Sequence, residues 1–107
     1  MQQITPKQLQ EWLADQTREQ PVLLDVRESW EQEICCLSGS VCIPMNSIPS
    51  RHQELSSDRE IVVVCHHGGR SMQVASFLIQ NGFNKIHNLS GGMDAWAREV
   101  DPSMATY

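Results

Sequence analysis

Apolar residues come in short runs that alternate with amphipathic stretches, and this alternation predicts strands that alternate with helices. Four mostly apolar runs are expected to be strands: residues 22–26, 41–43, 60–65 and 85–89. Since these runs lack a regular polar face, both faces of the strands are expected to be covered. The pattern therefore predicts an α/β fold of three layers, with helices on both sides of a mostly parallel sheet.

The amphipathic stretches carry start and stop signals for helices. The first helix is expected to begin at Thr5, with Pro6 at the first helical position and Gln8 completing a capping box. Apolar residues at helical spacing predict two later helices, over residues 71–81 and from residue 93 to about 100. Two further segments, a short polar turn or helix and an irregular or weakly helical stretch, are expected at residues 29–33 and 46–55.

Length and charge narrow the class of protein. A chain of 107 residues predicts a single domain over residues 1–107. The net charge is −5 and no basic stripe is visible, which argues against nucleic acid and anionic membranes as partners. No apolar stretch reaches membrane-spanning length, and the first residues lack the features of a signal peptide, so we expect a cytoplasmic location. In that reducing compartment the cysteines are expected to be free thiols.

One cysteine lies where chemistry is expected. Cys65 ends the central apolar run, and a short loop follows it before the next helix, with the sequence His66, His67, Gly68, Gly69, Arg70 and Ser71. The two glycines allow a tight turn with inward N–H groups, Arg70 adds a cation, and Ser71 is expected to cap the helix. Backbone N–H groups and the positive end of a helix dipole favour a thiolate over a thiol. We interpret Cys65 as a nucleophile and residues 66–71 as the loop that binds its sulfur.

Asp25 and Arg27 stand at the end of the strand expected over residues 22–26. In parallel sheets, ligands bind beyond the carboxyl ends of the strands. The two side chains are therefore expected near the Cys65 loop, as a structural pair that braces it in preference to a direct catalytic role.

Other conspicuous residues have simpler interpretations. Cys42 is expected to be a small core residue, and the three tryptophans Trp12, Trp30 and Trp96 are expected to pack in the core or between helices. The acidic run of Glu28, Glu31 and Glu33 is expected to form a solvated face. The spacing of cysteines and histidines matches no usual zinc pattern, so no metal ligands are expected.

Four segments together resemble the rhodanese homology domain, and the resemblance covers nearly the whole chain. They are Asp25–Glu28 with Glu31, Gly39–Pro44, the loop Cys65–Ser71, and Leu89–Trp96. The resemblance implies an α/β domain with a core of about five parallel strands. It also implies a catalytic cysteine that carries sulfur as a persulfide, which places that role on Cys65.

The implied activity is that of a sulfurtransferase, without a cofactor or a metal. Cys65 would take sulfane sulfur from thiosulfate or a persulfide and pass it to a thiol or to cyanide, with a protein persulfide as a further possible donor or acceptor. Four residues separate Cys65 from Arg70, whereas the related cell-cycle phosphatases have five. The shorter loop favours a sulfur atom over a phosphoryl group.

Two departures from the family pattern keep alternatives open. Cys35 and Cys36 stand where the family usually has Gly-His, and the loop lacks the lysine found in members that use thiosulfate. One alternative is a persulfide carrier or docking module for a partner protein. Another is a thiol redox enzyme, similar to an arsenate reductase, that uses Cys65 with Cys35 or Cys36.

Overall fold

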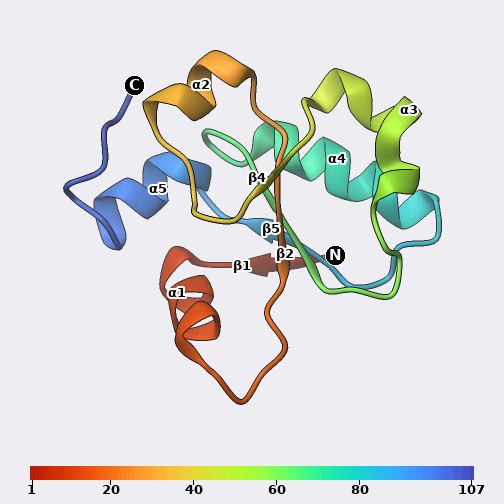
Figure 1. The fold of residues 1–107 in the computed structure, drawn as a ribbon, viewed down its shortest axis with the longest axis horizontal. Coiled ribbons are helices and arrows are strands. Elements are labelled where there is room, and N and C mark those ends of the chain that lie inside the picture. The colour runs from red at the N-terminus through yellow and green to blue at the C-terminus, as the bar shows by residue number, and fades with distance from the viewer.

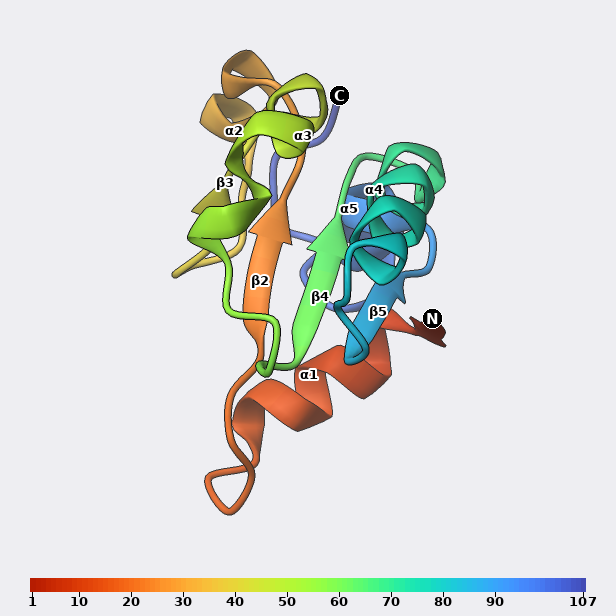
Figure 2. The ribbon, with the colours of Figure 1, turned by 90° about the vertical axis from the view of Figure 1, so that its right-hand side faces the viewer.

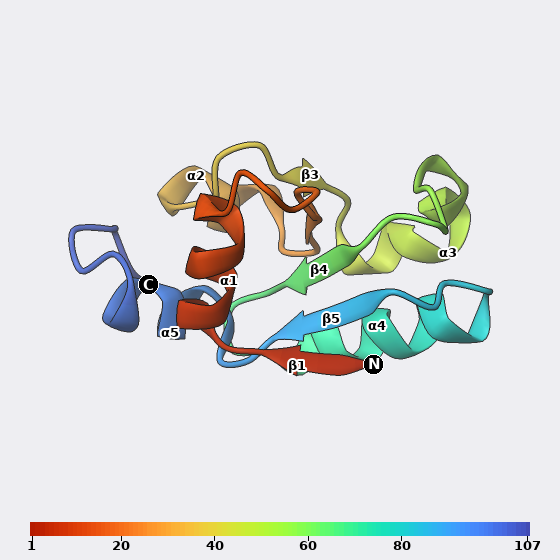
Figure 3. The same ribbon diagram turned by 90° about the horizontal axis from the view of Figure 1, so that it is seen from below.

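The computed structural model describes all residues 1–107 and contains one sheet of five strands, all parallel. The strand order is β1-β5-β4-β2-β3, and Figure 3 shows β1, β5 and β4 side by side. The predicted parallel α/β architecture is therefore confirmed. The strand bounds are Gln2–Ile4 (β1), Val22–Asp25 (β2), Val41–Cys42 (β3), Ile61–Val64 (β4) and Ile86–Leu89 (β5).

The register of the central strands determines where the site can form. Asp25, the last residue of β2, lies level with Val64, the last residue of β4. Cys65 and Arg27 therefore both leave the sheet at its carboxyl edge. Figure 2 shows β2, β4 and β5 running in the same direction, with α2 (Ser29–Ile34) and the C-terminus beyond their arrowheads.

Helices cover both faces of the sheet. In Figure 1, α1 (Pro6–Ala14) and α5 (Gly92–Glu99) lie to one side of the strands, and α3 (Ile48–Arg51) and α4 (Gly69–Gln80) lie to the other. Two 3-10 turns, Met45–Ser47 and His52–Glu54, flank the short α3.

The core is divided by the sheet into two clusters of buried side chains. One cluster of 12 residues packs the sheet against α4 and the segment around Ile48, and Cys65 belongs to it. The other cluster, of 10 residues, packs the opposite face against α1 and α5 and contains Trp12 and Trp96. The predicted packing of these two tryptophans is confirmed, and burial of both faces explains why the strands are apolar.

Two predictions about burial are wrong. Cys42 is exposed, because β3 is an edge strand of two residues and both of its side chains face solvent. Trp30 lies on the outer face of α2 and its residue is 57% exposed. None of the helices combines the length and the hydrophobicity that crossing a membrane requires.

Candidate functional site

Cys65 lies directly after β4, at the carboxyl edge of the sheet, and α4 begins four residues later at Gly69. Its residue is only 1% exposed. Gly68 holds the N-cap position of α4 with a φ of 108°, in the left-handed region that favours glycine. The structure therefore places the thiol between the end of a central strand and the start of a helix, as the sequence predicted.

Two groups contact the sulfur directly. The Gly68 N–H donates to Cys65 Sγ at 2.9 Å, and the Cys65 thiol donates to Ser71 Oγ at 3.3 Å. The predicted capping role of Ser71 is wrong, because the helix begins two residues earlier and Ser71 lies in its first turn. The Ser71 hydroxyl instead contacts the Gly68 carbonyl oxygen at 3.1 Å and the side-chain oxygen of buried Asn88.

Several N–H groups around the thiol are free. The backbone N–H groups of residues 66, 67 and 69–71 make no hydrogen bond within the chain. Those of residues 69–71 belong to the first turn of α4, where N–H groups have no partner inside the helix. The loop therefore has spare donors at the positive end of a helix dipole, where an anion is favoured.

The start of α5 holds the loop from outside. Met93 N donates to the Cys65 carbonyl oxygen at 2.8 Å, and Asp94 N donates to the His66 carbonyl oxygen at 3.0 Å. A Cβ at Gly92 would lie 2.3 Å from that Cys65 oxygen, whereas a Cβ at Gly69 would meet nothing within 4 Å. The close approach thus requires glycine at position 92, which we did not identify as a site residue from the sequence.

Arg70 points to a carboxylate. Its guanidinium donates to both carboxylate oxygens of Glu31 at 2.6 and 2.7 Å, and Glu31 is only 3% exposed. These hydrogen bonds lower the pKa of Glu31 to about 2. The prediction that Glu31 belongs to a solvated face is therefore wrong, since its buried carboxylate pairs with the partly buried Arg70 and ties α2 to the loop.

Asp25 and Arg27 form a buried ion pair with an N–O distance of 2.7 Å. Burial opposes the charge of Arg27, but hydrogen bonds to Asp25 and Tyr107 raise its pKa overall. Arg27 also donates to the Cys35 carbonyl oxygen at 2.7 Å. Neither side chain of the pair forms a hydrogen bond with residues 65–71, so the pair acts on the end of α2 and on the C-terminal segment.

Tyr107 joins these two ion pairs, which the sequence did not indicate. Its hydroxyl accepts from Arg27 at 3.0 Å and donates to Glu31 Oε2 at 2.8 Å. Its ring stacks on His66, with a centroid distance of 4.0 Å, and meets Trp30 edge-on at 5.7 Å. Burial, assisted by the hydrogen bond to Glu31, raises the pKa of Tyr107 to about 12.

The two loop histidines lie against each other, with ring centroids 3.9 Å apart. Burial first, and then neighbouring His67, lower the pKa of His66, which favours its neutral ring. Potential metal-ligand atoms of His66, His67 and Asp94 lie within 4.8 Å of one another. Arg98 already donates to the Asp94 carboxylate at 3.2 Å, so a metal ion would compete with an arginine for this ligand.

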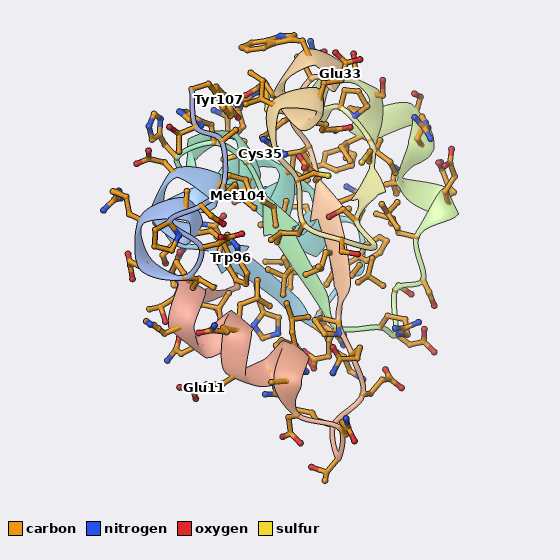
Figure 4. All side chains as sticks on the ribbon, turned by 60° about the vertical axis from the view of Figure 1, so that its left-hand side comes forward. Glu11, Glu33, Cys35, Trp96, Met104 and Tyr107 are labelled. Atoms are coloured by element: carbon orange, nitrogen blue, oxygen red, sulfur yellow. The ribbon has the colours of Figure 1, made fainter.

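The four cysteines are free and differ in their surroundings. Cys36 and Cys42 are exposed, whereas Cys35 is half-buried with its Sγ 3.8 Å from Arg27 Nη1. Cys35 shares the lining of one small pocket with His66 and Tyr107. Figure 4 shows Cys35, just after α2, close to Tyr107 on the C-terminal segment.

A search of protein families matches residues 5–99 to the rhodanese-like domain. The chain belongs to this family. It is 36% identical over 103 residues to a protein named sulfurtransferase from Allochromatium vinosum, a match that covers 96% of this chain and 94% of that protein. It is 40% identical over 89 residues to the rhodanese-like/PpiC domain-containing protein 12 of Arabidopsis thaliana, but spans 30% of that protein's length.

A solved structure supports the same assignment. A rhodanese-related protein from Thermoplasma volcanium superposes on this fold with a TM-score of 0.84. The two chains are 29% identical, and the match covers 94% of each. The rhodanese fold predicted from the four sequence segments is thereby confirmed.

Proposed function

We propose that residues 1–107 form a single rhodanese-like sulfurtransferase domain that moves sulfane sulfur through a persulfide on Cys65. The Allochromatium vinosum relative named sulfurtransferase supports sulfur transfer as the general activity. The observation that carries the proposal is the environment of the thiol. Gly68 N–H and the Ser71 hydroxyl already contact Sγ, and free N–H groups of the loop remain for a second sulfur.

In the first step the Cys65 thiolate attacks the outer sulfur of a donor. With a persulfide donor R–S–SH, a bond forms between Sγ and the outer sulfur, the donor S–S bond breaks, and R–S⁻ leaves. With thiosulfate the leaving group is sulfite. In the second step an acceptor thiolate or cyanide attacks the outer sulfur, and the electron pair of the broken bond returns to Cys65 as its thiolate. Two successive transfers predict ping-pong kinetics.

The loop stabilises the charge that moves between the two sulfur atoms. The N–H groups of residues 66, 67 and 69–71 have no partner within the chain, and we expect them to donate to the persulfide anion, which is electrostatic stabilisation of the oxyanion-hole type. When Cys65 ionises, the Ser71 hydroxyl can turn to donate to Sγ. Asp25 and Arg27 act indirectly, because Arg27 donates to the Glu31 carbonyl oxygen and to the Tyr107 hydroxyl. Glu31 in turn binds Arg70, and Tyr107 stacks on His66.

For the donor we propose a persulfide in preference to thiosulfate. Thiosulfate is a dianion, and a cationic side chain without an anionic partner would favour its binding. Arg70 is bound to Glu31, Arg27 is bound to Asp25, and His66 has a lowered pKa. A donor that carries less charge suits this loop better.

The direct test is Cys65→Ser, compared with Cys42→Ser as the matched control on the exposed edge strand. A hydroxyl cannot carry sulfane sulfur, so we expect Cys65→Ser to lose all sulfur transfer to cyanide while its far-UV circular dichroism stays unchanged. Cys42→Ser is expected to retain full activity. Substantial transfer by a folded Cys65→Ser protein would contradict the proposal.

A second candidate is supported by the position of Cys35. Cys35 lines the same pocket as His66, the residue that follows Cys65. If Cys35 attacked the Cys65 persulfide at its inner sulfur, a disulfide would form and HS⁻ would leave, which would make the protein a thiol redox enzyme that needs a dithiol reductant for each turnover.

A further inference from the structure

The outer face of α2 carries an exposed aromatic residue beside the sulfur site. We propose that Glu28, Trp30, Glu33 and Tyr107, here called the α2 rim, dock a partner protein that presents a cysteine on a basic, apolar surface. This inference rests on the proposed sulfur transfer and names the acceptor of that sulfur. The partner is recognised by the apolar contact of Trp30 and by the charge around it.

The stability of the fold does not explain why Trp30 is exposed. Its residue is 57% exposed, the highest value among the large hydrophobic residues of the chain, and the other two tryptophans are buried. An exposed tryptophan loses favourable burial, and tryptophan is enriched at the centres of protein interfaces. Its edge-on contact with Tyr107 holds the ring in place without covering it.

Aromatic side chains connect Trp30 to the sulfur loop. Trp30 contacts Tyr107 with a centroid distance of 5.7 Å, Tyr107 stacks on His66 at 4.0 Å, and His66 directly follows Cys65. The adjacent residue of α2, Glu31, binds Arg70 at the other end of the loop. A partner that covers Trp30 therefore lies next to the side chains that contact the Cys65 loop.

The charge of the rim defines the partner. Glu28 and Glu33 flank Trp30 on α2, both are exposed, and neither forms an ion pair. The nearby cations Arg27 and Arg70 are neutralised by Asp25 and Glu31. The rim is thus acidic in a chain of net charge −5, and basic groups beside the partner's cysteine complement it.

Docking at the α2 rim also explains how an acceptor reaches the buried sulfur of Cys65. Because Sγ is enclosed, an acceptor thiol needs to be aligned with the outer sulfur of the persulfide, which lies about 2 Å beyond Sγ. The acceptor R–S⁻ attacks this sulfur in Cys65–S–SH, a new R–S–SH forms, and Cys65–S⁻ is released. Binding at the rim makes this step effectively intramolecular.

The test uses Cys65 loaded with sulfur and three acceptors: glutathione, a single-cysteine peptide flanked by lysine and leucine, and a peptide of equal length flanked by glutamate and serine. The variants are Trp30→Ala and Glu33→Lys. Their matched controls are Ile79→Ala, an exposed apolar residue of α4, and Glu11→Lys. Figure 4 shows Glu33 on α2 and Glu11 on α1 at the opposite end of the molecule.

We expect wild type to transfer sulfur to the basic peptide about fivefold faster than to the acidic one, and added salt to reduce this difference. Trp30→Ala and Glu33→Lys should each slow transfer to the basic peptide about fivefold and leave transfer to glutathione unchanged. The two control variants should behave as wild type. The docking proposal would be contradicted if wild type transferred sulfur to both peptides at equal rates. It would also be contradicted if the rim variants slowed transfer to glutathione as much as transfer to the basic peptide.

Failure of the docking proposal is distinguishable from failure of sulfur transfer itself. Loading of each variant is first confirmed by intact mass, before any acceptor is added. If wild type does not take up sulfur, the proposed function is wrong. If loading and transfer to glutathione are normal and the rim variants have no effect on the basic peptide, the sulfurtransferase assignment stands and the α2 rim is not its docking surface.

Discussion

At the scale of single residues, Tyr107 connects the parts of the site that the sequence separates. Its hydroxyl lies between Arg27 and Glu31, and its ring covers His66. The two ion pairs Asp25–Arg27 and Glu31–Arg70 thereby form one network under the loop. Removal of one member of a buried network leaves its partners unsatisfied, so the network holds the loop in one conformation.

Tyr107 can be observed by itself, because it is the single tyrosine of the chain. Its pKa is raised to about 12, mainly by burial. We expect an ultraviolet absorbance titration of the native protein to show one phenol with a midpoint near 12, instead of the usual ~10. The stability from neutral Tyr107 is then complete below pH ~10 and is lost as the pH rises through 12. A midpoint near 10 in the folded protein would contradict this contact.

Residues at strand ends were predictable, and their distant partners were not. Cys65, Asp25 and Arg27 follow apolar runs, so parallel topology alone places them at one edge. Glu31 is buried by two distant partners: Arg70 lies 39 positions away in the sequence, and Tyr107 lies 76 positions away. No local pattern encodes contacts at such separations, which is why Glu31 was predicted to be solvated.

At the scale of elements, the loop depends on the start of α5. The N–H groups of Met93 and Asp94 bind the carbonyl oxygens of Cys65 and His66, and Gly92 makes this approach possible. The helix thus positions the backbone of the loop from outside, while α4 supplies N–H donors from inside.

Gly92→Ala and Gly69→Ala form a matched pair. At position 92 the new Cβ would meet the Cys65 carbonyl oxygen, and the backbone φ is 59°, so we expect a loss of at least about 2 kcal/mol of unfolding free energy and impaired sulfur loading. At position 69 a Cβ meets nothing, so the change should stay within about 0.5 kcal/mol. Urea denaturation measures both. Equal stability of the two variants would contradict the close approach at α5.

Elements with strong local signals were predicted well. The capping box of Thr5 and Gln8 is present at α1, and the helices α4 and α5 begin within two residues of their predicted starts.

The strand β1 was not predicted from the sequence. It has three residues, two of them exposed glutamines, so it carries no strand pattern, and it pairs only because β5 offers an edge. Its Gln3 side chain accepts from Asn88, which contacts Ser71, so even this short strand reaches the site.

At the scale of the whole molecule, the four thiols belong to three different parts of the fold. Cys65 follows the central strand β4, Cys42 lies on the edge strand β3, and Cys35 and Cys36 follow α2. Cys65 packs in the core on one face of the sheet, whereas Cys35 packs against the core on the other face. The alternation of strands and helices predicted these layers, but predicting the exposure of Cys42 required knowledge that β3 is an edge strand.

A protein with Cys35→Ser, Cys36→Ser and Cys42→Ser tests whether one thiol is sufficient. Cys36 and Cys42 are exposed, and Cys35 is held beside Arg27, so we expect the triple variant to load sulfur and to turn over as wild type does. Transfer to cyanide is the assay, and intact mass reports the loading. Normal loading with lost turnover would instead favour the redox mechanism that uses a second cysteine.

The central claim, that Cys65 carries sulfane sulfur, is tested most directly by mass spectrometry. The native protein is incubated with a small persulfide donor, and its intact mass is measured before and after dithiothreitol. We predict the gain of one sulfur atom, located on Cys65 by peptide mapping and removed by the reductant. A protein that gains no sulfur, or gains it on Cys35, Cys36 or Cys42 while Cys65 stays unmodified, would contradict the account.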